Sequence, residues 1–222
     1  VEHQLVQGAR CLEVGCGRGV FQDLVSDYTG VDLAASVAQY LHKPFVQASA
    51  TALPFPDGSF DAAWTIWVFE HVPDPELAMT ELRRVLKPGG LLFFAPAWQC
   101  RPWAADGYPV RPYSDFDLKG KLYKAMIPLR DTVAWRSLFT IPRRLRRLVT
   151  SKLRPGPTTF RYKKLRGNFE KFWMSDSDAI NAMDAYEGLV WFQSRGDQVL
   201  HPTGFSRQFL VRNGHLLVRI RK

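Results

Sequence analysis

Three glycines near the start of the chain have the spacing that could bind a ligand through the backbone. Gly15, Gly17 and Gly19 alternate directly after an apolar run, residues 9–14, whose acidic member is Glu13. Glycine has no Cβ and adopts positive φ easily, so glycines this close together predict a turn that lets the backbone approach a ligand. A strand that enters such a turn and continues into a helix forms a nucleotide-sized crevice in open α/β sheets. The spacing is G-x-G-x-G, which differs from the G-x-G-x-x-G of dinucleotide-binding proteins.

A carboxylate at the end of the next apolar run complements this turn. Asp32 follows the run over residues 28–31 and lies 19 residues after Glu13, a separation that fits a strand–helix–strand unit. An ionised carboxylate can accept two hydrogen bonds from the vicinal hydroxyls of a ribose. The alternative is that Asp32 only caps a helix over residues 33–41.

Two further segments make the pattern specific. Residues 50–61 read A-x-x-L-P-F-x-D-x-S-F-D, and residues 81–90 read E-L-x-R-V-L-K-P-G-G. Together with the glycine turn, they resemble class I S-adenosylmethionine-dependent methyltransferases of the ubiquinone-methylase-like family, methyltransferase type 11. The resemblance covers about residues 9–95. It implies S-adenosyl-L-methionine as the cofactor and S-adenosyl-L-homocysteine as the product.

The resemblance also implies roles for individual residues. Glu13 stands where the family has an acid that helps to hold the methionine end of the cofactor, and the alternative is that it only braces the turn. Ser49 stands where the family has an acidic residue that binds the adenine amino group. Residues 65–67 should line the methionine side, although Trp67 would also suit plain core packing. The cofactor-binding residues that we expect are Glu13, Gly15, Cys16, Gly17, Gly19, Asp32, Leu33, Ser49, Ala50, Thr51, Thr65, Ile66 and Trp67.

A general base is needed if the acceptor is a hydroxyl that must lose its proton. His71 is the catalytic candidate by residue type, because imidazole titrates near neutral pH. The E-H-V-x-D-P pattern around it also occurs in relatives that methylate carbon, nitrogen, oxygen and sulfur, which favours a structural role. Four other side chains compete for the role of base: His201, Tyr108, Tyr113 and Asp106. The five histidines form no ligand set with Cys, Asp or Glu, so we expect no metal.

The elements that must position these residues alternate along the chain. Apolar runs predict strands over residues 9–14, 28–31, 45–48, 62–67 and 91–95, with a helix over 76–86. This alternation predicts an α/β fold with a doubly wound parallel sheet. The resembled fold has seven mostly parallel strands in a Rossmann-like arrangement, an antiparallel last strand and a helical insertion after strand 5. We place its sixth and last strands at residues 198–200 and 215–221. Residues 1–9 should be the end of a helix, and residues 175–178 should cap another helix that includes Ile180, Met183, Tyr186, Leu189, Val190 and Phe192.

Length and composition fit a single domain. The 222 residues are divided into a cofactor-binding half over 9–95, a basic and aromatic insertion or acceptor lid over 97–174, and a C-terminal helix with closing strands over 175–222. No apolar run approaches the ~18 residues of a membrane span. The three cysteines form no metal-ligand spacing and indicate a reduced compartment. We expect a cytoplasmic protein, with the inner face of the membrane as an alternative position, and, because the chain begins at Val1, a preceding segment.

Charge divides the chain in two. The net charge is +9, but residues 1–100 carry −5 and residues 101–222 carry +14. We therefore expect the first half to bind the cofactor and the second half to contact an anionic partner or surface. Three interpretations of the basic insertion remain open. They are a solvated lid, an amphipathic helix over 141–149 that rests with residues 141–171 on anionic lipid, and a nucleic-acid surface, which the lack of an RNA-binding motif disfavours.

The acceptor is the least determined part of the function. The insertion, the C-terminal helix and residues 194–197 loosely resemble bacterial methylases that accompany glycan-assembly enzymes. We therefore expect O-methylation of a sugar, a glycan-like acceptor or another small anionic acceptor. The alternatives are a methylase of a lipid, quinone or secondary metabolite, and a binding or regulatory protein that kept the fold but lost catalysis. The intact glycine turn and Asp32 argue against the last of these.

Overall fold

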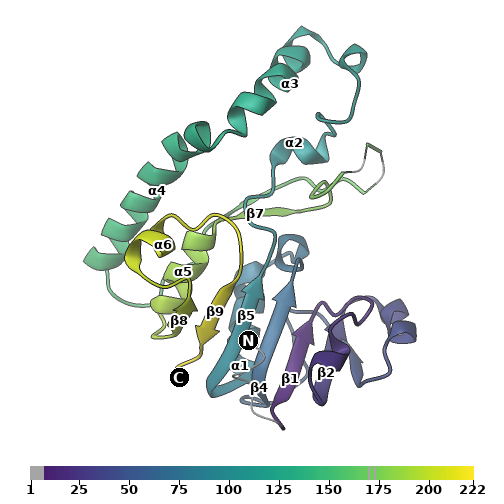
Figure 1. Cartoon of the computed structure of the whole chain (residues 1–222), viewed down its shortest axis with the longest axis vertical. Helices are drawn as coiled ribbons and strands as arrows, with labels where there is room; N and C mark the ends of the chain where they lie inside the picture. The colour runs from purple at the N-terminus through teal and green to yellow at the C-terminus, as the bar shows by residue number, and fades with distance from the viewer. Residues whose placement is uncertain (1–7, 170, 173) are drawn as a thin grey trace.

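A seven-stranded sheet forms the centre of the structure, a computed structural model that describes residues 8–169, 171–172 and 174–222 (Figure 1). The strand order is β3-β2-β1-β4-β5-β9-β8. The first five strands are mutually parallel, and β9 runs antiparallel to both β5 and β8. This confirms the predicted mostly parallel seven-stranded fold with an antiparallel last strand. The strands are β1 (Arg10–Val14), β2 (Asp27–Asp32), β3 (Phe45–Gln47), β4 (Phe60–Ile66), β5 (Leu86–Ala95), β8 (Gln198–His201) and β9 (Leu216–Arg219).

The central strands are apolar because helices or loops cover both faces of the sheet. In β1 and β4, side chains on both faces are buried, as is typical of parallel strands. In the register, Glu13 of β1 lies opposite Gly30 of β2 and Trp64 of β4. The carboxyl ends of these three strands therefore meet at one edge, where open α/β sheets bind their ligands.

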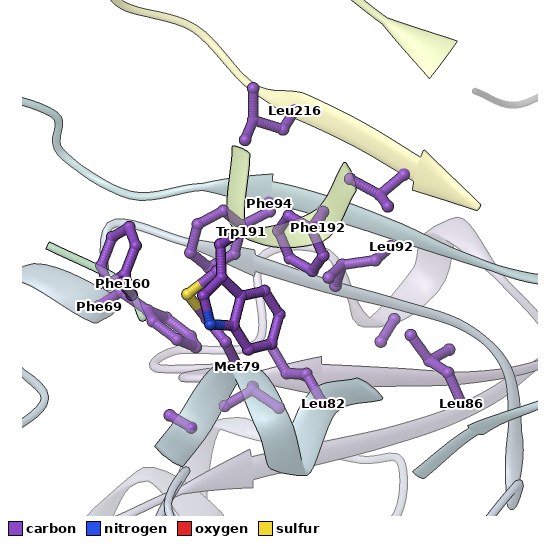
Figure 2. Packing of buried hydrophobic residues seen from close by; sticks show 14 of the residues in the cluster. Phe69, Met79, Leu82, Leu86, Leu92, Phe94, Phe160, Trp191, Phe192 and Leu216 are labelled. Atoms are coloured by element: carbon purple, nitrogen blue, oxygen red, sulfur yellow. The ribbon is translucent and has the colours of Figure 1, made fainter. Parts of the chain in front are cut away.

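The main core lies between one face of the sheet and the helices α1 (Pro75–Val85) and α5 (Ala185–Gln193). Figure 2 shows Trp191 and Phe192 of α5 beside Phe94 of β5 and above Leu82 of α1. Asp74 accepts a hydrogen bond from the Leu77 N–H at 3.0 Å and caps α1. The sequence prediction of this helix over 76–86 is therefore confirmed to within one residue.

The crossovers that lead to β2 and β3 are shorter than a helix of several turns. They contain only the 3₁₀ segments η1 (Gln22–Leu24) and η2 (Ala35–Tyr40). The expected helix over 33–41 is thus a 3₁₀ segment. It has no buried residue, so it lacks the apolar face that stabilises short α-helices in proteins. The helix expected over residues 1–9 falls almost wholly outside the described residues.

The chain after β5 forms a helical arm that extends away from the sheet (Figure 1). The arm contains α2 (Pro102–Ala105), the 3₁₀ segment η4 (Tyr113–Asp115), α3 (Leu118–Arg130) and α4 (Val133–Leu153). The chain returns through β6 (Tyr162–Lys164), which pairs antiparallel with β7 (Asn181–Met183), and a short helix α6 (Phe205–Phe209) follows β8.

The helix expected after Ser175 to Asp178 is confirmed from Tyr186 to Phe192, but the prediction is wrong for the cap and for Ile180 and Met183. The residues up to Met183 include strand β7, and α5 begins only after Asp184, whose carboxylate accepts from the Tyr186 N–H at 3.0 Å. Pairing with β6 determines this difference, because a strand ladder between distant segments overrides local helical spacing.

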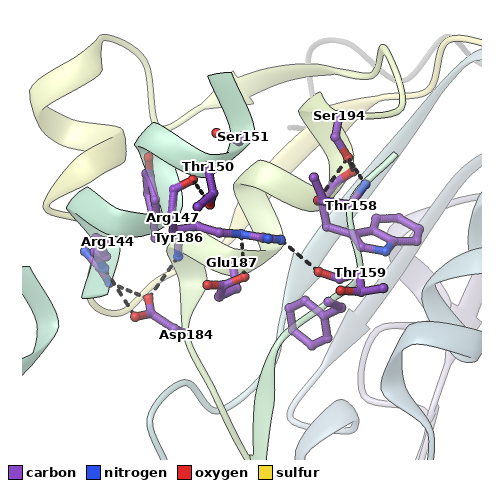
Figure 3. Close-up of polar contacts among 12 residues, drawn as sticks. Arg144, Arg147, Thr150, Ser151, Thr158, Thr159, Asp184, Tyr186, Glu187 and Ser194 are labelled. Carbon is purple, nitrogen blue, oxygen red and sulfur yellow. Dashed lines mark hydrogen bonds and ion pairs between the residues drawn. The ribbon is translucent and has the colours of Figure 1, made fainter. Parts of the chain in front are cut away.

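Two buried arginines dock α4 onto α5 (Figure 3). Arg144 donates to both carboxylate oxygens of Asp184 and, at 2.6 Å each, to the carbonyls of Phe209 and Val211. Arg147 Nε lies 2.9 Å from Glu187 Oε2. Both arginines are 3% exposed, so this part of the insertion is packed rather than solvated.

Candidate functional site

The glycine turn after β1 has backbone geometry that favours glycine. Gly15 has φ +76°, and its N–H donates to the Val31 carbonyl at 2.7 Å. A Cβ on Gly15 would lie 2.1 Å from Val68 Cγ2. Any side chain there would force apart the turn and the loop after β4, so the spacing seen in the sequence has a steric cause.

Asp32 ties this turn to the end of β2. Its Oδ2 accepts from the Gly17 N–H and its Oδ1 from the Ala34 N–H, each at 3.0 Å. A carboxylate has about four lone-pair positions, so two remain for hydroxyl donors. A Cβ on Gly17 would meet nothing within 4 Å, so the turn faces open space. This arrangement fits a ribose-bearing ligand that lies against the turn.

Glu13 lies beneath the turn rather than at its surface. Its carboxylate is 4% exposed and accepts from the Tyr28 hydroxyl at 2.5 Å. Burial raises the pKa of Glu13, and the hydrogen bond from Tyr28 opposes that rise. The neighbouring Cys16 is also buried, and burial raises the pKa of its thiol to about 12, so the thiol stays neutral. These contacts favour a bracing role for Glu13. Sequence reasoning did not identify Tyr28 as its partner, because the phenol belongs to a different strand.

The loop after β3 forms a second side of the site. The Ala48 N–H donates to the Asp32 carbonyl at 3.0 Å, which brings the start of this loop beside the end of β2. Ser49 Oγ lies 2.8 Å from Thr51 Oγ1 and also accepts from the Thr51 N–H. Leu33 is exposed, and Ala50 is partly exposed next to Ser49. The structure thus gathers this predicted set near Asp32, although Ser49 already has a hydroxyl partner.

The residues at the end of β4 separate into two environments. Trp67 is 73% exposed and adopts φ +54°, and its N–H donates to the Ala95 carbonyl at 3.0 Å. Non-glycine residues at positive φ are uncommon and occur often at functional sites. Ile66 is partly exposed, whereas Thr65 is 1% exposed on the core side. Trp67 can reach a ligand at this edge, and the core-packing alternative for it is wrong.

His71 lies in the 3₁₀ segment η3 (Phe69–His71) that follows β4. Its Nδ1 lies 3.4 Å from the Asp178 carbonyl and its Nε2 3.8 Å from Glu70 Oε1. Glu70 is buried, accepts from the Ala97 N–H at 3.1 Å and has its pKa raised by burial. The imidazole therefore bridges two loops, which favours the structural interpretation.

Replacement of His71 by alanine tests this interpretation. We expect turnover to fall by less than about tenfold, because a positioned general base contributes roughly 10²–10⁴-fold. The melting temperature should fall slightly, since the contact with the Asp178 carbonyl is lost. A loss of about 100-fold or more in kcat at an unchanged melting temperature would make His71 the base.

The competing bases lie on other parts of the chain. Tyr108 stacks on Phe116 at 4.6 Å within the insertion, and His201 stacks on His215 at 4.6 Å beside β9. Tyr113 is exposed in η4, and Asp106 ends α2. In the described part of the chain, none of the four is hydrogen-bonded to the glycine turn. No group of three or more His, Cys, Asp or Glu side chains among the described residues could hold a metal ion.

Comparison with known proteins finds a match over the first half of the chain. Residues 12–94 match a family described as methyltransferase domain. The 2-methyl-6-phytyl-1,4-hydroquinone methyltransferase of Synechocystis sp. is 40% identical over 104 residues, 41% of this chain and 33% of that protein. The ubiquinone/menaquinone biosynthesis C-methyltransferase of Hahella chejuensis is 42% identical over 79 residues, 35% of this chain and 32% of that protein.

Two more proteins are similar to this chain over about the same share of its length. The fatty-acid O-methyltransferase of Mycolicibacterium smegmatis is 35% identical over 105 residues, 41% of this chain and 38% of that protein. The crystal structure of the YcgJ protein from Bacillus subtilis is 28% identical and covers 41% of this chain and 45% of that chain, with a TM-score of 0.39. The chain spans about a third of the length of these curated relatives.

Proposed function

We propose that the protein is an S-adenosylmethionine-dependent methyltransferase that acts on a lipid-like or quinone-like acceptor. The match of residues 12–94 to the methyltransferase domain family supports the reaction type. The observation that carries the reaction type is the pairing of the glycine turn with Asp32, which leaves carboxylate lone pairs and an open backbone side by side.

The relatives favour this acceptor class over the sugar or glycan that we expected first. Their names specify a phytyl hydroquinone, ubiquinone or menaquinone, and a fatty acid, all of which have long apolar parts. Similarity to them is confined to the cofactor-binding half, so it supports an acceptor class only together with features of the second half. The arm formed by α3 and α4 supplies such a feature.

In the proposed reaction, the protein's main task is to orient the cofactor and the acceptor. S-adenosylmethionine, when bound, supplies an electrophilic methyl group on sulfur. Asp32 would hold the ribose hydroxyls, the glycine turn would lie against the cofactor, and Glu13 would keep the turn rigid from below. Trp67, exposed at the end of β4, would exclude water from one side of the methyl group.

Each of the two long arm helices has an exposed apolar stripe. The exposed residues recur at helical spacing: Leu118, Leu122, Met126 and Leu129 on α3, and Leu138, Ile141, Leu145, Val149 and Leu153 on α4. Residues 118–154 also hold eleven Lys or Arg against the single acid Asp131. Apolar stripes bordered by cations suit the surface of an anionic bilayer, and the stripe begins earlier than the expected 141–171 segment. No helix in the described part of the chain has the length and hydropathy to cross a membrane.

Negative charges introduced into the apolar stripe of α4 test membrane contact. The Leu138→Glu/Leu145→Glu variant should lose cosedimentation with vesicles that contain phosphatidylglycerol, because two carboxylates would have to enter the lipid interface. Leu24→Glu, an exposed leucine outside the arm, should bind like wild type. Binding should also weaken as salt is raised. Equal binding by all three proteins would contradict the membrane arm.

Methyl transfer itself is tested with S-adenosylmethionine that carries a tritium-labelled methyl group. The protein is incubated with a total lipid extract and, separately, with the aqueous metabolites of the same cells, and the products are partitioned between solvent and water. We expect enzyme-dependent label in the solvent phase of the lipid reaction. Label found only in the aqueous reaction would reject the acceptor class while keeping the reaction type.

A further inference from the structure

A cationic pocket lies between the start of the arm and the β6–β7 hairpin. Its volume is about 370 Å³, and its lining includes residues 99–103, residues 161–163, residues 182–184 and parts of α4. Five lining side chains are cations and two, Asp184 and Glu187, are carboxylates. The cations are Arg101, Arg136, Arg143, Arg161 and Lys163.

The carboxylates near this pocket are already paired. Asp184 accepts from Arg144, and Glu187 lies against Arg147, and both arginines approach from α4 (Figure 3). Arg143 shares Asp184 at 2.9 Å. The other nearby acid, Asp131, pairs with Arg101 at 2.9 Å.

Three of the pocket cations are in no close ion pair with the carboxylates that the structure describes. Arg136, Arg161 and Lys163 form no ion pair within 4 Å among the residues that the structure describes. Arg136 donates from Nη2 to the Asp131 carbonyl at 2.6 Å, while its Nε is buried without a partner. Burial, and then the charges of Arg212 and Arg101, lower the pKa of Arg136, and the carboxylate of Asp131 opposes this shift.

A neutral donor adds to this set. Gln99 Nε2 is buried and has no partner in the described part of the chain, although the residue lines the pocket. The backbone of Gln99 adopts φ +59° and donates to the Met183 carbonyl at 2.8 Å. A buried donor left without an acceptor is unfavourable, so such a group points to a missing ligand oxygen.

From these observations we propose that the pocket binds a phosphate-bearing group. A phosphate presents several acceptor oxygens in different directions, which matches donors from α4, from the hairpin and from Gln99 better than a planar carboxylate would. The group could belong to a soluble phosphorylated molecule or to a phospholipid headgroup.

The pocket is connected to the methyl-transfer edge through the backbone. Gln99 follows β5 by four residues, and β5 ends at Ala95, whose carbonyl accepts from Trp67. A phosphate in the pocket would thus anchor the acceptor away from its reacting atom. This acceptor role rests on the proposed methyl transfer, whereas the phosphate site itself does not.

Calorimetric titration with inorganic pyrophosphate tests the site in the full chain. We expect saturable binding of one pyrophosphate, weakened about tenfold in Arg136→Gln/Arg161→Gln, because two charge-assisted contacts are lost. The single variant Arg161→Gln alters an exposed side chain and should retain the fold while weakening binding. Arg146→Gln, which removes the same charge from an exposed position of α4 outside the pocket, should bind within about twofold of wild type.

Two results would overturn the site: no saturable binding of pyrophosphate, or an equal loss in Arg161→Gln and Arg146→Gln. Vesicles of phosphatidylcholine with and without phosphatidic acid then distinguish the source of the phosphate. A headgroup requires that Arg161→Gln weakens cosedimentation with the phosphatidic acid vesicles and that pyrophosphate competes. If the ligand is soluble, neither Arg161→Gln nor added pyrophosphate changes cosedimentation with the phosphatidic acid vesicles. Pyrophosphate binding without S-adenosylhomocysteine binding would reject the methyltransferase proposal and keep the phosphate site. S-adenosylhomocysteine binding without pyrophosphate binding would reject the phosphate site and keep the methyltransferase proposal.

Discussion

Asp32→Ala is expected to weaken S-adenosylhomocysteine binding by about 100-fold. The ribose hydroxyls of the ligand would lose two hydrogen bonds to the carboxylate, and hydrogen bonds to a charged group contribute about 1.5–3 kcal/mol each. The substitution would also remove the acceptor of the Gly17 and Ala34 N–H groups, each of which donates to Asp32 at 3.0 Å. Isothermal titration calorimetry of the variant and of wild type measures the difference directly.

The matched control is Asp27→Ala. Asp27 lies at the opposite end of the same strand and is exposed, so its removal changes net charge equally without touching the turn. Its affinity for S-adenosylhomocysteine should stay within about twofold of wild type. Equal affinities in Asp32→Ala and Asp27→Ala would show that Asp32 only caps the segment that follows β2.

Arg144→Met should have the largest effect on stability, about 3–5 kcal/mol in the free energy of unfolding. Methionine keeps most of the apolar stem but leaves Asp184 buried without its main cationic partner, and breaking a buried pair from one side costs this much. Two carbonyls, of Phe209 and Val211, would lose their donor as well. Urea denaturation followed by circular dichroism gives the change.

Arg146→Met provides the comparison on the same helix. Arg146 is exposed, so its replacement should change the free energy of unfolding by no more than about 0.5 kcal/mol. If the two variants unfolded at the same urea concentration, the docking of α4 onto α5 through Arg144 would be contradicted. A double replacement that also removes the Asp184 charge should recover part of the loss.

The cofactor-binding half could be predicted from the sequence because its determinants are local. Gly15 and Gly17 need positive φ within a few residues, and Asp32 ends the strand that neighbours β1 in a parallel unit. Spacing therefore placed the turn and the carboxylate at one sheet edge, and the family resemblance added the loop after β3. The packing beneath them, such as Tyr28 against Glu13, depends on strand register and left no sequence signal.

The second half could not be predicted in the same way, because distant segments determine it. Ile180 and Met183 have helical spacing, but residues 181–183 pair with β6, and the side chain of Asn181 donates to the carbonyls of Phe69 and Val72. The insertion looked uniformly basic, yet Arg144 and Arg147 are buried in ion pairs against α5, while Arg161 is exposed and has no ion pair within 4 Å among the described residues. One complementary signal was present: acids at 184 and 187 repeat the three-residue spacing of the two buried arginines.

Calorimetric titration of the full chain with S-adenosylhomocysteine tests the central claim most directly, since it requires no knowledge of the acceptor. The geometry of the glycine turn and Asp32 predicts one binding site per chain with a Kd on the order of micromolar. The absence of any binding heat and of any competition by S-adenosylmethionine at millimolar concentration would contradict a methyltransferase site at this sheet edge.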